Sequence, residues 1–124
     1  MKTINTQNAP AAIGPYSQAI AAGNILYTSG QIPLSPETNE VVGNNIEDQT
    51  EQVMKNIGAV LKAAGTDFKK AIKTTCFLSD MADFAAFNKI YANYFVLKPA
   101  RSCVAVKALP KGVLVEVEVI ASLE

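Results

Sequence analysis

The stretch VLVEVEVIAS, residues 113–122, has the period of two that predicts a β-strand. Successive side chains of a strand point to opposite faces. One face then carries an unbroken apolar row, which suits a position beneath helices: Val113, Val115, Val117, Val119 and Ala121. The other face mixes carboxylates with apolar side chains, namely Leu114, Glu116, Glu118 and Ile120. A face of this mixed kind indicates a surface partly covered by something else, such as another subunit.

The N-terminal half predicts a hairpin followed by a helix. Residues 19–22 and 24–32 are expected to be strands joined at Gly23-Asn24, a favourable turn. The helix is expected to begin at Asn45, a good N-cap, and to end at Gly65. Residues 2–6 are a candidate for one more strand.

The C-terminal half also predicts strands and a helix in alternation. Residues 72–78 and 100–106 predict strands, and a helix between them is expected to begin near Asp80 and to run up to Pro99. This helix carries a stripe of aromatic side chains at helical spacing. We interpret the stripe as a surface packed against a sheet, with a ligand surface as the alternative.

The order of these elements predicts an α+β fold, in which a mixed β-sheet carries two helices on one face. No repeat, linker or low-complexity tract interrupts residues 1–124, so we expect a single domain. The opposite face of the sheet needs a cover, which favours an oligomer.

Composition narrows the possible chemistry. The chain has 49% hydrophobic and 18% charged residues, which is typical of a compact domain. Lys plus Arg and Asp plus Glu both number 11, so charge gives no reason to expect nucleic-acid binding. The chain contains no histidine, which excludes Ser-His-Asp and Cys-His catalysis and histidine-ligated metals. No cofactor is predicted.

Two cysteines, Cys76 and Cys103, make neither a disulfide framework nor a four-ligand zinc site, and they suit a reducing compartment. The first ten residues contain no apolar run like that of a signal peptide, and no segment is long enough to cross a bilayer. The expected location is therefore the cytoplasm.

Three side chains are the main candidates for chemistry. Arg101, in KPARSCVAV (98–106), is expected either to form an internal ion pair or to bind the carboxylate of a ligand through two hydrogen bonds. Glu116, with Glu118 on the same face, belongs either to a solvated outer row or to a site where one carboxylate orients a water molecule. A glycosidase pair is disfavoured because no sugar-binding platform lies nearby in the sequence.

Weaker candidates surround these residues. Cys103 has the same strand parity as Arg101 and is interpreted as a pocket wall, because no histidine is present to activate its thiol. Tyr16 follows a Gly-Pro turn and is either a cover for the core or a ligand contact. Gly30 would let a ligand approach the backbone closely.

Taken together, five segments resemble the Rid (YjgF-like) family of reactive-intermediate imine deaminases: IGPYSQA (13–19), LYTSGQIP (26–33), KTTCFLSDMADFAAFNKIY (73–91), PARSCVAV (99–106) and VEVEVIA (115–121). The resemblance covers nearly the whole chain. It implies a chorismate-mutase-like subunit, a homotrimer with clefts between subunits, and hydrolysis of 2-imino acids to 2-keto acids and ammonia. The imines would be released as enamines by pyridoxal-phosphate dehydratases.

By the same resemblance, Arg101 binds the substrate carboxylate and Glu116 positions the hydrolytic water. The remaining substrate-binding residues that the resemblance implies are Tyr16, Ser29, Gly30, Asn88, Ser102 and Cys103. In one place the chain departs from the family pattern. The link before PARS is shorter than usual, and Lys98 stands where an aromatic residue is common.

Two other functional classes compete with the enzyme. A non-catalytic regulatory protein could use the same cleft to sense 2-keto acids. A ribonuclease or translation inhibitor is an activity attributed to family relatives, and zero net charge and the absence of histidine count against it.

Overall fold

The predicted C-terminal strand is β6 (Val115–Ser122), and it lies inside a six-stranded sheet between β3 (Ile25–Thr28) and β4 (Ala71–Leu78). The computed structural model describes residues 1–124. Along β6 the odd-numbered side chains are buried and the even-numbered ones are half-buried, which confirms the predicted division into two faces. Each large apolar side chain buried in this way stabilises the fold by about 1.5–3 kcal/mol.

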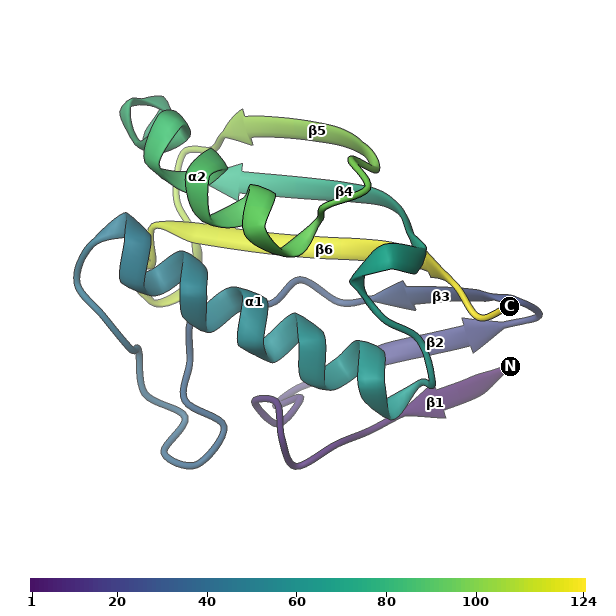
Figure 1. The fold of residues 1–124 in the computed structure, drawn as a ribbon. Coiled ribbons are helices and arrows are strands. Elements are labelled where there is room, and N and C mark those ends of the chain that lie inside the picture. Colours follow the sequence, from purple (N-terminus) through teal and green to yellow (C-terminus); the bar gives the residue numbers. More distant parts are fainter.

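The sheet has the order β1-β2-β3-β6-β4-β5 and is mixed, as predicted. All neighbouring strands are antiparallel except β4 and β5, which are parallel. Figure 1 shows the order from β1 at one edge to β5 at the other. The other five strands are β1 (Lys2–Ile4), β2 (Ala19–Ala22), β3 (Ile25–Thr28), β4 (Ala71–Leu78) and β5 (Ala100–Ala105).

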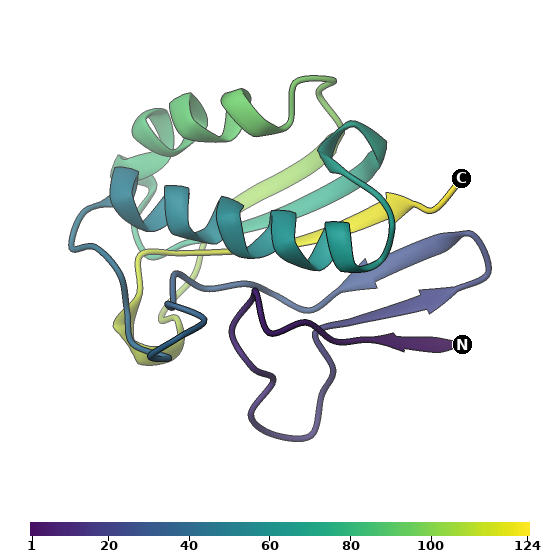
Figure 2. The same cartoon turned by 60° about the horizontal axis from the view of Figure 1, so that its bottom comes forward.

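Both helices, α1 (Ile46–Ala63) and α2 (Phe84–Tyr94), cover the same face of the sheet, which leaves the other face without helices (Figure 2). Asn45 caps α1 by accepting a hydrogen bond from the backbone N–H of Asp48 at 2.8 Å. At the other end Gly65 takes a φ of 83°, a left-handed conformation that favours glycine, and the chain turns away. Both ends of α1 are therefore as predicted.

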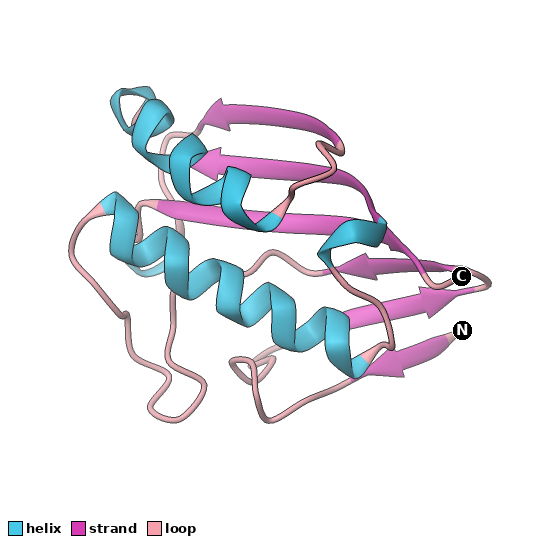
Figure 3. Cartoon of the chain, in the orientation of Figure 1, coloured by secondary structure: helices cyan, strands magenta, loops and turns pink.

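The core lies between the helices and the sheet. It contains the apolar face of α1, the odd-numbered row of β6 and the aromatic side chains Phe87, Tyr91 and Phe95 of the α2 segment. The aromatic stripe thus packs mainly as predicted. Short 3-10 helices complete the fold (Figure 3): η1 (Phe68–Lys70), η2 (Met81–Asp83) and η3 (Pro110–Gly112). No helix of the chain has the length and apolar character that crossing a membrane requires.

Several predicted boundaries are wrong. The second helix is expected to begin near Asp80, but Met81–Asp83 form the 3-10 helix η2 and α2 begins at Phe84; the last strand begins at Val115 and not at Val113. The strand expected over 24–32 ends at Thr28, because the register of this segment with β6 shifts by one residue between the pair Tyr27–Ile120 and the isolated pair Gln31–Val117. The second helix ends at Tyr94, well before Pro99. There Phe95 leaves the helical conformation, with ψ at 65°.

Candidate functional site

Arg101 points to the helix-covered side of the sheet. In the parallel β4–β5 pair it lies opposite Thr74, which is buried beneath α2. Its Nη1 donates a hydrogen bond to Oδ1 of Asn88 at 2.7 Å, and its guanidinium carbon lies 4.9 Å from the ring centre of Tyr91. These partners are a neutral amide and an aromatic ring, so within the chain the guanidinium keeps its charge available for an anion.

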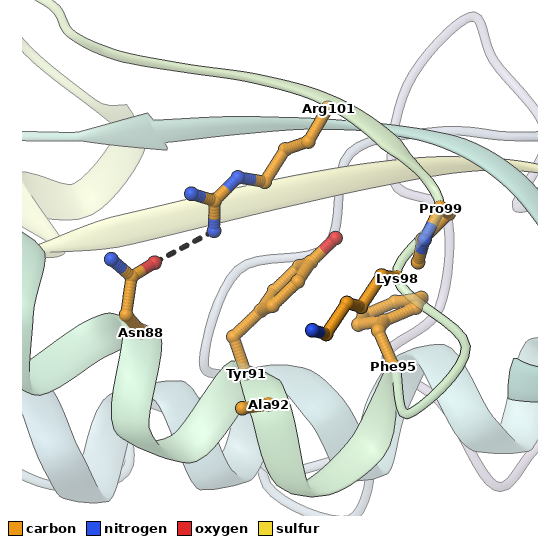
Figure 4. A pocket seen from close by; sticks show the side chains of 7 residues that line it. All are labelled: Asn88, Tyr91, Ala92, Phe95, Lys98, Pro99 and Arg101. Carbon is orange, nitrogen blue, oxygen red and sulfur yellow. Dashed lines mark hydrogen bonds between the residues drawn. The ribbon is translucent and has the colours of Figure 1, made fainter.

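A pocket of about 310 Å³ opens beside Arg101, between α2 and β5 (Figure 4). That volume is at the lower end of the range for small-molecule sites, which suits a small metabolite. None of the lining residues carries a carboxylate: they are Asn88, Tyr91, Ala92, Phe95, Lys98, Pro99 and Arg101. The arrangement can accept an anionic ligand.

Tyr91 forms one wall of this pocket and is held in place from below. Its hydroxyl shares a 2.7 Å hydrogen bond with Oγ1 of Thr74, and burial raises the pKa of the phenol. The sequence favours packing for the aromatic stripe that includes Tyr91, with a ligand surface as the alternative, and it places Lys98 in the shortened link. The structure shows that Tyr91 and Lys98 both line the pocket, together with Phe95.

Cys103 shares the helix-facing side of β5 with Arg101, as its parity predicted, whereas Ser102 is exposed on the alternate side. Burial raises the pKa of the Cys103 thiol, and it raises that of the neighbouring Cys76 thiol to about 12. Both thiols are therefore protonated near neutral pH. Neither has the properties of a thiolate nucleophile.

Glu116 lies on the other side of the sheet, the face that carries no helix. Burial, and next to it the negative charge of Glu118, raises the pKa of the Glu116 carboxyl above its usual value. A carboxylate whose pKa is raised toward neutrality is well suited to exchange protons with a substrate or a water molecule.

The backbone at Gly30 makes room for this carboxylate. Gln31 and Val117 exchange backbone hydrogen bonds of 2.8 and 3.1 Å, which hold Gly30 against β6. A Cβ at position 30 would overlap the Glu116 carboxylate, with the carboxyl carbon only 2.8 Å away. The space that we expected a ligand to use is thus filled by Glu116 itself.

Tyr16 and Ser29 lie around this second group. Ser29 donates its hydroxyl hydrogen to the carbonyl of Ser17 at 2.5 Å, and so ties the loop before β2 to the end of β3. Tyr16 is half-exposed and lines a small cavity of about 60 Å³ together with Gly30. The loop is fixed further by buried Gln18, whose amide donates to the carbonyl of Pro10 at 2.8 Å.

The predicted site residues therefore form two groups in a single chain. Arg101, Asn88 and Cys103 lie on the helix-covered side, and Glu116, Gly30, Tyr16 and Ser29 gather around the other side. One chain does not bring the two groups together. No cluster of acidic or cysteine side chains in the chain has the makings of a metal site.

Comparison with known proteins supports the resemblance found in the sequence. A family model described as endoribonuclease L-PSP matches residues 6–123. The crystal structure of YyfA from Yersinia pestis, described as a protein of the conserved Rid family, is 57% identical, with a TM-score of 0.95 and 98% of each chain covered. The chain belongs to the Rid family.

Relatives of this Rid chain carry names of different kinds. A protein of Mus musculus named 2-iminobutanoate/2-iminopropanoate deaminase is 48% identical, over 97% of this chain and 90% of its own length. A protein of Lactococcus lactis that is named as a regulator, AldR, is 58% identical, over 100% of this chain and 99% of its own length. The names of similar proteins thus include that of an enzyme and that of a regulator.

Proposed function

We propose that this Rid protein is an enzyme that hydrolyses small 2-imino acids, such as 2-iminobutanoate and 2-iminopropanoate, to 2-keto acids and ammonia. The observation that carries the proposal is the Arg101 guanidinium, which faces a pocket without a carboxylate and has no anionic partner of its own. The name of the mouse relative supports the same reaction. The imines would come from enamines that pyridoxal-phosphate dehydratases release.

Arg101 binds the carboxylate of the imino acid in this proposal. The planar guanidinium matches a carboxylate through two parallel hydrogen bonds. Asn88 accepts a hydrogen bond from the guanidinium on one side, and the Tyr91 ring lies against it on another. The guanidinium therefore loses little orientational freedom when the substrate binds.

Glu116 acts on the hydrolytic water. Its carboxylate accepts a proton from the water as the oxygen attacks the carbon of the protonated imine, which forms a C–O bond, breaks the C=N π bond and leaves an amino group on a tetrahedral carbon. The proton then passes from Glu116 to the amino nitrogen. The C–N bond breaks as the new hydroxyl gives its proton back to Glu116, so that ammonia leaves, a 2-keto acid remains, and Glu116 finally releases its proton to solvent. A carboxyl with a raised pKa suits these transfers.

The two groups meet if chains assemble, and we propose a homotrimer with its sites between subunits. Arg101 and its neighbours come from one copy, and Glu116 and Gly30 come from the next. Tyr27 pairs with Ile120 of β6, and Val104 pairs with Phe77, which in turn pairs with Glu116. The exposed apolar side chains of Tyr27 and Val104 therefore lie on the same helix-free face as Glu116. Covering them would favour association.

The first experiment measures imine decay. A threonine or serine dehydratase generates the imine, and its disappearance is followed with and without this protein. The proposed enzyme accelerates the decay, and light scattering gives three times the chain mass of 13.2 kDa. A monomer at micromolar concentration, or no acceleration, contradicts the proposal.

Mixed oligomers test the division of the site between chains. Arg101→Ala and Glu116→Gln chains, each expected to have about a hundredth of the wild-type activity or less, are unfolded together in equal amounts and refolded. About a quarter of the sites should then combine an intact Arg101 with an intact Glu116 from the neighbouring copy. Activity near a quarter of the wild-type value is expected. If both residues act from one chain, the mixture stays as inactive as its parts.

A non-catalytic regulator is the second candidate, and the name of the Lactococcus lactis relative favours it. A regulator of this kind binds 2-ketobutyrate at the Arg101 pocket and does not change the rate of imine decay. Calorimetry with 2-ketobutyrate, carried out beside the decay assay, separates the two functions.

A further inference from the structure

The pocket at Arg101 holds a second cation that the proposed reaction does not use. Lys98 and Arg101 both line the cavity, and none of the other lining residues is acidic. In Figure 4 the Lys98 side chain runs from the loop back toward Tyr91, so its ammonium faces the same cavity as the guanidinium. The single carboxylate of a simple imino acid neutralises only one of these charges.

The backbone fixes where Lys98 begins. Its N–H donates to the carbonyl of Phe95 at 3.2 Å, and Pro99 follows with its restricted backbone. Lys98 itself has a φ of 55°, in the left-handed region that non-glycine residues adopt rarely. The lysine side chain is thus held at the mouth of the pocket by a tight turn that a glycine would adopt with less strain.

We propose that Lys98 binds a second anionic group, so that the protein prefers 2-imino acids whose side chains end in a carboxylate. This inference rests on the proposed function, since it assigns a substrate class to the same site. Arg101 takes the carboxylate next to the imine carbon, and Lys98 takes the carboxylate at the far end. Apolar surface from Phe95 and Ala92 covers the methylene groups between them.

Glutamate and norvaline provide matched test substrates, because their imines have five-carbon chains that differ in the terminal group. Each imine is made in situ by a suitable amino-acid oxidase, and its hydrolysis is measured against trapping by semicarbazide. The readout is the ratio of kcat/KM for the acidic imine to that for the neutral imine. A substitution that damages the enzyme in general lowers both kcat/KM values together, so it leaves their ratio unchanged.

Lys98→Gln should lower this ratio about tenfold, because one charge-assisted contact at an exposed position is lost. Lys111→Gln is the matched control. Lys111 is also an exposed lysine with a left-handed backbone, at φ 56°, but it belongs to η3 and reaches toward Asn39. It should leave both rates unchanged. A ratio within twofold of wild type in Lys98→Gln, or an equal drop in Lys111→Gln, overturns the proposal.

Binding of stable keto acids separates this inference from the proposed reaction. Calorimetry compares 2-ketoglutarate with 2-ketovalerate on the wild-type protein and on both variants. If no imine is hydrolysed but Lys98→Gln selectively weakens the binding of 2-ketoglutarate, the proposed reaction is wrong and the proposed binding of a second carboxylate by Lys98 is supported. If imines are hydrolysed and Lys98→Gln changes neither the ratio of kcat/KM values nor the ratio of keto-acid affinities, the proposed reaction is supported and the role proposed for Lys98 is wrong.

Discussion

The helix-covered side of the sheet at Arg101 and the helix-free side at Glu116 differ in how completely one chain builds them. On the first side an aromatic wall, an amide and two cations already form a pocket. On the second side a half-buried carboxylate lies over Gly30 beside a small cavity. The first group therefore forms a pocket within one chain, whereas the second forms only a small cavity beside the carboxylate.

Their separation has an electrostatic advantage. A guanidinium and a carboxylate on the same face of one chain would form an ion pair, and each would satisfy the other. Because Arg101 and Glu116 lie on opposite faces, they do not pair within one chain, which leaves each available for the role that we propose for it.

The largest effect on activity is expected at the helix-covered side. Arg101→Ala should lower kcat/KM for imine hydrolysis roughly a thousandfold, because the substrate carboxylate loses its charged partner. Arg101→Lys should also be poor, because an ammonium does not reproduce the two-point contact. Melting temperature should change little, since the bond to Asn88 is only partly buried. Near-normal turnover by the lysine variant would rule out bidentate binding.

On the helix-free side, Glu116→Gln should lower turnover about a hundredfold while binding of 2-ketobutyrate persists. Glutamine keeps the shape of the side chain and loses the proton acceptor. Glu118→Gln is the control on the same face, and it should have little effect on turnover. Equal and small effects of both substitutions would return Glu116 to a solvated surface row.

Gly30→Ala tests whether the close approach of the backbone to Glu116 matters. The new methyl group would overlap the carboxylate, so the side chain must move. Displacing a catalytic group by about 1 Å can reduce the rate substantially, and we expect a loss of roughly tenfold in turnover. Gly58→Ala adds a methyl group within α1, 3.2 Å from the Phe68 ring, and serves as the control. Unchanged turnover in Gly30→Ala would show that the approach has no catalytic role.

The smallest effect concerns stability and pH. The pKa of Glu116 is raised by folding from its ordinary value of 4.5, chiefly by burial, so the folded chain binds this proton more tightly than the unfolded chain does. The contribution of Glu116 to stability is therefore fully present below pH 4.5 and is lost as the pH rises through the raised value. Glu116→Gln removes this loss, and it should melt slightly higher than wild type at pH 7.

Below pH 4, where Glu116 is protonated in both states, the two proteins should melt at the same temperature. Calorimetric scans across this range check the expectation. A difference that is independent of pH would assign the change to packing and not to the charge.

Much of the fold could be predicted because local signals agreed with the final packing. The alternation in β6, the N-cap at Asn45 and the turn at Gly65 all remain in the structure. Boundaries that depend on contacts distant in sequence were missed. The end of β3 follows from a one-residue shift in its register with β6, which lies about 90 residues further along the chain.

The sequence allowed individual residues of the candidate site to be predicted, but it gave less information on which of them lie together. Parity placed Cys103 with Arg101 correctly, but it gave no indication that Glu116 lies on the opposite face of the sheet, since that depends on how β5 and β6 pair with β4. Tyr91 and Lys98 were seen as a packing residue and as a link residue. Their shared pocket arises only because α2 ends at Tyr94 and the chain turns back toward β5.

The order of the strands also has a consequence for how the protein is made. The strand that joins the two halves of the sheet, β6, is the last strand along the chain. During synthesis, β1 to β3 and the β4–α2–β5 unit leave the ribosome before the strand that connects them, so the sheet closes only when residues 115–122 emerge. Until then the edges of β3 and β4 that later pair with β6 are open to wrong partners, and a chaperone that shields β-strand edges would have its largest effect at this stage.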